Sequence, residues 1–214
     1  MRFSRGPGVA APIVAALLIA GCVPSAPSQT NGASSPPIEY RAPAVVGETV
    51  SESPLESDEW VIAARAAQLG YVLAANSADF SIEPFVSTFT TRGAYLAYST
   101  FLYRAVGGDR VPFTWSGPTI LIPIAVEPVD ESTAKVWFCD GSDFLATGDT
   151  NDLLNGVEII ITLERVNGEI RESSSARSLD GCDATGAPIA MFDPAPTPLG
   201  SITKADVVPP PSSD

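Results

Sequence analysis

The hydrophobic pattern of this chain changes its period near Pro112, and that change constrains the fold more than any other feature. Before it, residues 59–76 and 91–106 place apolar side chains three or four positions apart, as one face of a helix requires. These side chains are Ile62, Ala66, Leu69 and Leu73 in the first segment, and Tyr95, Tyr98, Leu102 and Ala105 in the second. After Pro112 the apolar runs are short and rich in β-branched residues, which is typical of strands. The sequence therefore predicts helices first and strands afterwards.

Four segments after Pro112 have the length and composition of strands. They are residues 119–126, 133–140, 157–166 and 169–176. Polar turns at 129–132 and 166–168 separate the members of each pair, and Asn167-Gly168 is the strongest hairpin signal in the chain. Helices followed by hairpin-connected strands predict an α+β fold, in which N-terminal helices pack on an antiparallel sheet of about four strands.

Local signals mark the ends of the predicted helices. Ser57-Asp58-Glu59 offers a side-chain cap and an acidic first turn for the first helix. Residues 81–89 are expected to add a short helical turn, and Gly107-Gly108 ends the second long helix.

Proline-rich segments flank this predicted core on both sides. Residues 22–56 and 193–214 contain many prolines and few large apolar side chains. Such segments bury too little apolar surface to offset the entropy of ordering them. We therefore expect a disordered tether before the domain and a disordered tail after it. Residues 57–192 then form one domain, long enough for a single hydrophobic core.

The N-terminus carries a targeting signal. Arg2 and Arg5 precede an apolar run at residues 9–20, which is typical of a secretory signal peptide. Ile19-Ala20-Gly21-Cys22 resembles the lipobox of bacterial lipoproteins, whose cysteine receives a diacylglyceryl group while the preceding peptide bond is cut. The resemblance implies a signal peptide at residues 1–21 and a lipid anchor on Cys22, at the extracytoplasmic face of the cell membrane. An ordinary secretory signal with an incidental cysteine is the alternative.

Charge and composition exclude several classes of function. The chain has 12 basic and 25 acidic residues, for a formal net charge of −13. Such a surface repels nucleic acid, so we expect no nucleic-acid partner. The chain contains no histidine, which excludes Ser-His-Asp and Cys-His mechanisms as well as histidine metal ligation. We expect no cofactor and no metal.

The remaining cysteines form an even pair. With Cys22 assigned to lipid, Cys139 and Cys182 are left, and outside the cytoplasm such a pair is most simply a disulfide.

The order helix, short helix, helix and four strands resembles the cone-shaped domain of the nuclear transport factor 2-like superfamily. The segment at 133–142, Thr-Ala-Lys-Val-Trp-Phe-Cys-Asp-Gly-Ser, resembles a strand of secreted lipoproteins with that domain. In those proteins a cysteine followed by an acid pairs with a later cysteine, which implies the same pairing for Cys139 and Cys182. The resemblance covers residues 57–183 and implies a curved, cone-like sheet with a concave site. Dehydratase and isomerase members carry Asp-His or Tyr-Asp constellations, and this chain lacks the histidine.

Four side chains are candidates for the wall or mouth of such a site. Tyr95 and Tyr98 form a stripe that belongs either to the core or to a pocket wall. Asp79 and Glu83 come between the helices, where a carboxylate could serve as a general base without histidine. The alternative is that both are solvated loop acids. Calcium could be bound through the oxygens of Asp140, Asp143, Asp149 and Asp152, but their spacing does not match a calcium-binding loop, which favours a solvated acidic loop.

Three hypotheses for function follow. The leading one is a lipid-anchored, non-enzymatic binding or scaffold domain, whose partner is a small apolar ligand or another envelope protein. The second is a small-molecule enzyme that uses a carboxylate in the cone, and the third is a purely structural partner of an envelope protein. A cone filled with apolar side chains favours a scaffold, whereas an open cone with a buried acid and a tyrosine favours catalysis.

Overall fold

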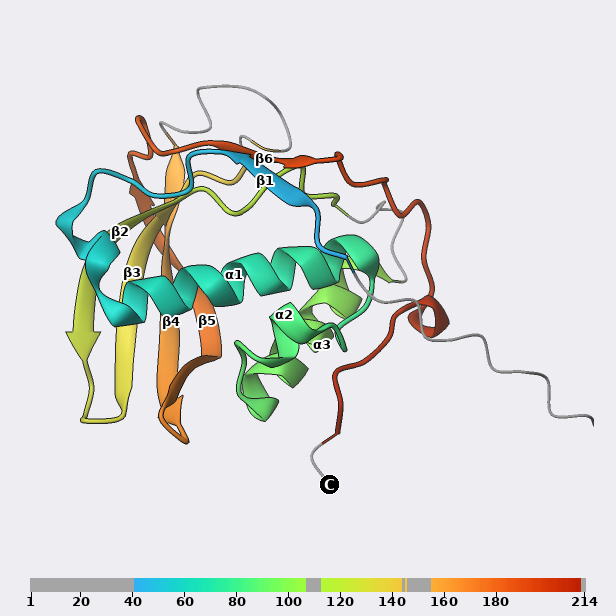
Figure 1. Cartoon of the computed structure of the whole chain (residues 1–214), viewed down its shortest axis with the longest axis horizontal. Coiled ribbons are helices and arrows are strands. Elements are labelled where there is room, and N and C mark those ends of the chain that lie inside the picture. The colour runs from blue at the N-terminus through green and yellow to red at the C-terminus, as the bar shows by residue number, and fades with distance from the viewer. Residues whose placement is uncertain (1–40, 107–112, 144, 146–154, 213–214) are drawn as a thin grey trace, which may run out of the picture. The chain divides into compact units, whose positions relative to one another are not determined.

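The structure is a computed structural model, and it describes residues 41–106, 113–143, 145 and 155–212. It confirms the predicted fold class, because three helices pack against a four-stranded antiparallel sheet (Figure 1). The predicted signal peptide, Cys22 and the tether as far as residue 40 lie outside the described residues. Gly107-Gly108 also lies outside them.

The sheet is a meander whose strands are neighbours in chain order. It comprises β2 (Leu121–Pro128), β3 (Thr133–Asp140), β4 (Gly156–Val166) and β5 (Glu169–Cys182). The bounds of β3 are those predicted, while β5 is longer and includes Cys182, which the sequence placed after the last strand. Asn167 and Gly168 both have positive φ, as the predicted Asn-Gly hairpin between β4 and β5 requires.

A β-bulge in β5 changes which side chains are buried. Thr162 pairs with Ser174 and Leu163 pairs with Glu172, so Ser173 is an additional residue on β5. Glu172 and Ser173 are consequently both buried, although neighbouring side chains of a regular strand point to opposite faces.

The long helix α1 (Glu59–Ser77) lies across the sheet and contacts all four strands (Figure 1). As predicted, Asp58 caps it, since Trp60 N donates to Asp58 Oδ1 at 2.8 Å. The short helix α2 (Glu83–Val86) lies within the predicted helical turn, and α3 (Thr91–Ala105) begins where Gly93 N donates to Thr90 Oγ1.

The buried face of α1 agrees with the prediction only in part, because Leu73 is buried and Leu69 packs against the core as expected, while the first two predicted positions do not. Ile62 is 55% exposed and Ala66 is exposed, whereas Val61 and Ala64 are fully buried against the sheet. The helix is rich in alanine and is apolar almost all round, so periodicity alone did not define one face. The helix also meets α2 closely, since a Cβ on Gly70 would lie 2.3 Å from the carbonyl oxygen of Pro84.

A cluster of aromatic rings fills the space among the helices. Phe80 is fully buried and packs on Phe85, Tyr98 and Phe101, with ring centroids 5.1 to 5.5 Å apart. A second, separate cluster lies between α1 and the strands, so α1 contributes to both cores.

The flanking segments are ordered to a greater extent than predicted. Within the expected tether, β1 (Ala44–Gly47) pairs with β6 (Ala190–Asp193), and a 3-10 helix covers Pro54–Ser57. Within the expected tail, Val207 is buried and Val208 exchanges backbone hydrogen bonds with Ala78 and Phe80. These segments lack a core of their own, but they cover apolar surface that the domain already presents. Prediction from local composition does not include that contribution.

No helix in the described part of the chain is long and apolar enough to cross a membrane.

Candidate functional site

A cavity of about 300 Å³ lies among α1, α3 and the sheet. Helix α1 contributes Gln68 and Tyr71, and β5 contributes Glu172 together with residues 174–177. Helix α3 contributes residues 93, 97, 100 and 104, whose spacings of four, three and four place them on one helical face, together with the adjacent Leu96. The cavity therefore joins the helical layer to the sheet.

Glu172 is the most unusual residue of this cavity. Its side chain is almost completely buried, with the residue 2% exposed, and Gln68 Nε2 donates to its Oε2 at 2.8 Å. Two backbone hydrogen bonds of 2.9 Å hold the Glu172 main chain in place. Thr90 N donates to Glu172 O, and Glu172 N donates to Thr88 O. Burial raises the pKa of the Glu172 carboxyl to about 7, against the opposing effect of hydrogen bonds from Gln68 and Ser175.

Tyr71 lines the cavity beside this carboxyl. Burial raises the pKa of its hydroxyl above the usual range, while the nearby charge of Arg104 opposes that rise. The phenol therefore stays protonated at neutral pH and is a hydrogen-bond donor within the cavity.

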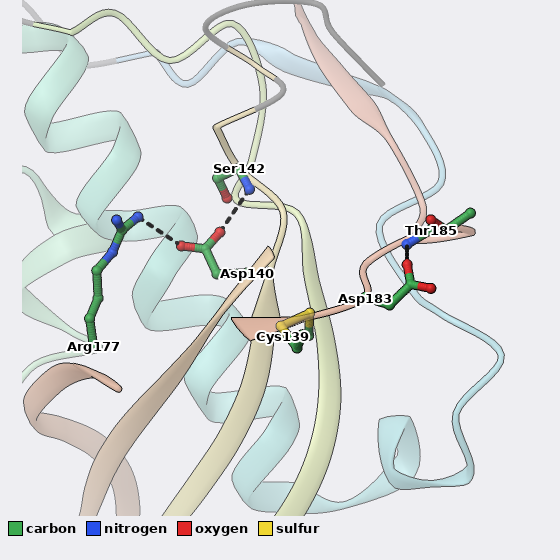
Figure 2. Close-up of a disulfide and its surroundings, with 7 residues drawn as sticks. Cys139, Asp140, Ser142, Arg177, Asp183 and Thr185 are labelled. Atoms are coloured by element: carbon green, nitrogen blue, oxygen red, sulfur yellow. Dashed lines mark hydrogen bonds and ion pairs between the residues drawn. A yellow bond between two sulfur atoms is a disulfide. The ribbon is translucent and has the colours of Figure 1, made fainter. Parts of the chain in front are cut away.

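Asp140 forms another polar part of the wall, at the end of β3. Its Oδ1 accepts from Ser142 N at 2.9 Å and its Oδ2 lies 3.4 Å from Arg177 Nη2 (Figure 2). Burial raises the pKa of the Asp140 carboxyl despite these contacts. The Arg177 side chain is half exposed, so this ion pair contributes little to stability.

The disulfide predicted between Cys139 and Cys182 is present directly beside Asp140 (Figure 2). It joins β3 to the last residue of β5, with the two Cα atoms 5.8 Å apart. Because β4 lies between these strands, the bond ties the sheet together next to the cavity.

The remaining walls are largely apolar, with Phe89, Trp115 and Ile159 among them. The backbone of Trp115 is held by Asn76, whose Oδ1 accepts from Trp115 N and whose Nδ2 donates to Trp115 O, both at 2.8 Å. This pair of hydrogen bonds fixes the loop before β2 to the end of α1.

Neither predicted tyrosine lines this cavity. Tyr98 is 8% exposed and belongs to the aromatic core, whereas Tyr95 is 64% exposed. The cavity faces the neighbouring positions Leu96 and Ala97 instead. The stripe was correctly recognised as helical, but Tyr98 faces Phe80 rather than the sheet.

The two predicted acids also lie outside the cavity. Asp79 Oδ1 accepts from Ser81 N and Ser81 Oγ at 2.8 and 2.6 Å, so this side chain stabilises a turn. Glu83 is exposed at the first position of α2. Sequence reasoning missed Glu172, because a glutamate among serines in a strand resembles a solvent-exposed residue.

The described residues hold no cluster of three or more acidic or cysteine side chains that could bind a metal ion. Asp149 and Asp152, considered for calcium, lie outside the described residues. No protein-family model matches this chain, and no curated protein or solved structure gives a significant match.

Proposed function

We propose that this protein is a lipid-anchored, extracytoplasmic binding module that holds a small, mainly apolar molecule in the cavity among α1, α3 and the sheet. The observation that carries this proposal is the cavity itself, which combines apolar walls with the buried carboxyl of Glu172. Small-molecule sites have this composition, with a few placed polar groups on a mostly apolar surface.

Neither the cavity nor the buried carboxyl stabilises the fold, so a purely structural domain does not account for them. An unfilled cavity costs stability, because the side chains around it lose contacts. A buried carboxyl without a charged partner costs more, and an apolar side chain of similar size would avoid that cost. A ligand that contacts Glu172 and fills the space explains why both features coexist.

The test of binding uses the full chain, purified in detergent from its own membranes. Mass spectrometry of a solvent extract should find a small molecule in a fixed ratio to protein. Ala97→Phe fills the cavity and should remove that molecule, whereas Thr91→Phe, on an exposed part of α3, should retain it. Recovery of a protein partner with no small molecule would instead support the structural alternative.

The anchor is tested separately through Cys22. Two or more long acyl chains give stable anchoring, at about 0.8 kcal/mol per buried methylene. Cys22→Ser should therefore abolish lipid labelling and release the protein from membranes, while Ser25→Ala should change neither. Membrane association of Cys22→Ser after a high-salt wash would contradict the lipobox interpretation.

A second candidate function is supported by the pKa of Glu172. A carboxyl with a pKa of about 7 is suited to general acid–base catalysis, and Tyr71 is a neutral donor in the same cavity. If Glu172 abstracts a proton from carbon, the bound molecule should take up deuterium from heavy water. Glu172→Gln should then stop the exchange while the molecule stays bound. An absence of exchange in the unaltered protein would contradict catalysis, and binding would remain as the function.

A further inference from the structure

The charges around the cavity indicate which molecule fits it, on the premise that the proposed function is correct. We propose that the occupant is a small monocation, whose ammonium group pairs with the Glu172 carboxylate and whose apolar body packs against Phe89 and Trp115.

The buried carboxyl of Glu172 determines the charge balance inside the cavity. Its hydrogen-bond donors are the amide of Gln68 and the hydroxyl of Ser175, and both are neutral. Within the described ranges the ion pairs involve Arg65, Arg165, Arg171 and Arg177, each with another acid, and Glu172 takes part in none of them. No cation in the part of the chain that the structure describes therefore pairs with this carboxyl.

The sign of a ligand's charge determines how well the ligand fits beside this carboxyl. A cation supplies the missing partner in a site of low dielectric, where a charge pair is stronger than in water. A neutral ligand leaves the buried carboxyl without a counterion, and an anion is repelled by Glu172. The chain's net charge of −13 also favours the approach of cations.

Aromatic side chains form part of the cavity wall. Tyr71, Phe89 and Trp115 all line the cavity, and the faces of aromatic rings attract ammonium groups. Asn76 holds the Trp115 backbone in place, so this part of the wall is built before a ligand arrives. The ring surface suits the apolar body of an amine as well as the charge at its end.

Four other charged or titratable groups face the same cavity: Asp140, Tyr71, Arg104 and Arg177. Arg177 is already engaged by Asp140, and Tyr71 is neutral. Arg104 is the cation that opposes the proposal. It is exposed, so solvent and salt screen its charge far more than they screen the buried Glu172.

The experiment measures binding of three probes of one size to the full chain in non-ionic detergent, by titration calorimetry. The probes are 2-phenylethylamine, 2-phenylethanol and phenylacetate. The amine should bind at least about tenfold more tightly than the alcohol, and phenylacetate should not bind. Glu172→Gln should weaken amine binding about 30-fold or more, because it removes one partner of a buried charge pair. Glu169→Gln removes the same charge from an exposed site on the same strand and should have no effect.

The pH dependence provides an independent readout. The amine stays protonated between pH 6 and 8, so its affinity follows ionisation of Glu172 and should fall about tenfold from pH 8 to pH 6. Binding of the alcohol, and of either probe to Glu172→Gln, should not show this fall.

The outcomes separate this inference from the proposed function. Equal binding of the amine and the alcohol, with both lost in Ala97→Phe, would overturn the monocation and leave the cavity as a binding site. Preference for phenylacetate would also overturn it and would assign recognition to Arg104. Binding of none of the probes would overturn the monocation, while the molecule recovered from membranes would still decide the proposed function.

Discussion

Gln68 Nε2 donates a hydrogen bond to Glu172 Oε2 at 2.8 Å, across 104 positions of sequence. The contact joins the middle of α1 to the bulge of β5 inside the cavity. Because the donor is neutral, it satisfies one oxygen of the carboxyl without balancing its charge. The protonation of Glu172 is therefore linked to the stability of the fold.

The first prediction concerns this linkage. The folded-state pKa of Glu172 is about 7 and that of an unperturbed glutamate is 4.5. Below pH 4.5 the carboxyl is protonated in both the folded protein and the unfolded chain, so the folded state has its full stability with respect to this group. As the pH rises from 4.5 to 7, the unfolded state ionises first, and about 3 kcal/mol of the unfolding free energy should be lost. Glu172→Gln should lack this loss.

The measurement is chemical denaturation of the full chain at pH 4.5, 6 and 8. Glu172→Gln should be more stable than the unaltered protein at pH 8 and close to it at pH 4.5. Glu169→Gln is the matched control and should keep the original pH dependence, since its side chain is largely exposed. Parallel pH profiles for all three proteins would mean that Glu172 has the same pKa in the folded protein as in the unfolded chain.

A second prediction concerns the contact between α3 and β5. A Cβ on Gly93 would lie 2.3 Å from the carbonyl oxygen of Glu172, so the two backbones meet where only glycine fits. Gly93→Ala should destabilise the fold by about 1 to 3 kcal/mol, as overpacking does. Arg92→Ala, at the adjacent exposed position, should change stability by less than about 0.5 kcal/mol. A Gly93→Ala protein as stable as Arg92→Ala would contradict this close packing.

A third prediction concerns the disulfide between Cys139 and Cys182. Their separation of 43 residues gives a chain-entropy stabilisation of at most about 4 kcal/mol. The double variant Cys139→Ala, Cys182→Ala should lose stability of that order in denaturant, while Cys22 stays intact. Non-reducing peptide mapping of the unaltered protein should find this cross-link. Two free thiols at these positions would refute the pairing.

A fourth prediction separates the two tyrosines of α3. Tyr98 packs on Phe80 in the core, so Tyr98→Ala should cost on the order of 3 to 5 kcal/mol, by analogy with other buried aromatic residues. Tyr95 is exposed, and Tyr95→Ala should cost less than about 0.5 kcal/mol. Thermal denaturation of both variants and of the unaltered protein measures the two losses of stability. Comparable losses would show that Tyr95 packs more tightly than its exposure indicates.

The sequence by itself determined the local elements of the domain. The Asp58 cap, the Asn167-Gly168 turn and the bounds of β3 were all predicted, and each depends on residues near one another in the chain. Capping groups, turn conformations and hydrophobic period act over a few residues, so the sequence displays them directly. The same information was sufficient for the α+β class and for four strands joined by hairpins.

Only the tertiary structure decided which side chains meet. The buried face of α1 depends on its packing against the strands, and the burial of Glu172 depends on the extra residue in β5. The ordered parts of the flanks depend on partners far away in the chain, as when residues 44–47 pair with 190–193. Each of these is a contact between distant segments, whose energy exists only after the chain has folded. No local pattern of residues contains that energy, which is why the sequence did not reveal the cavity or its buried acid.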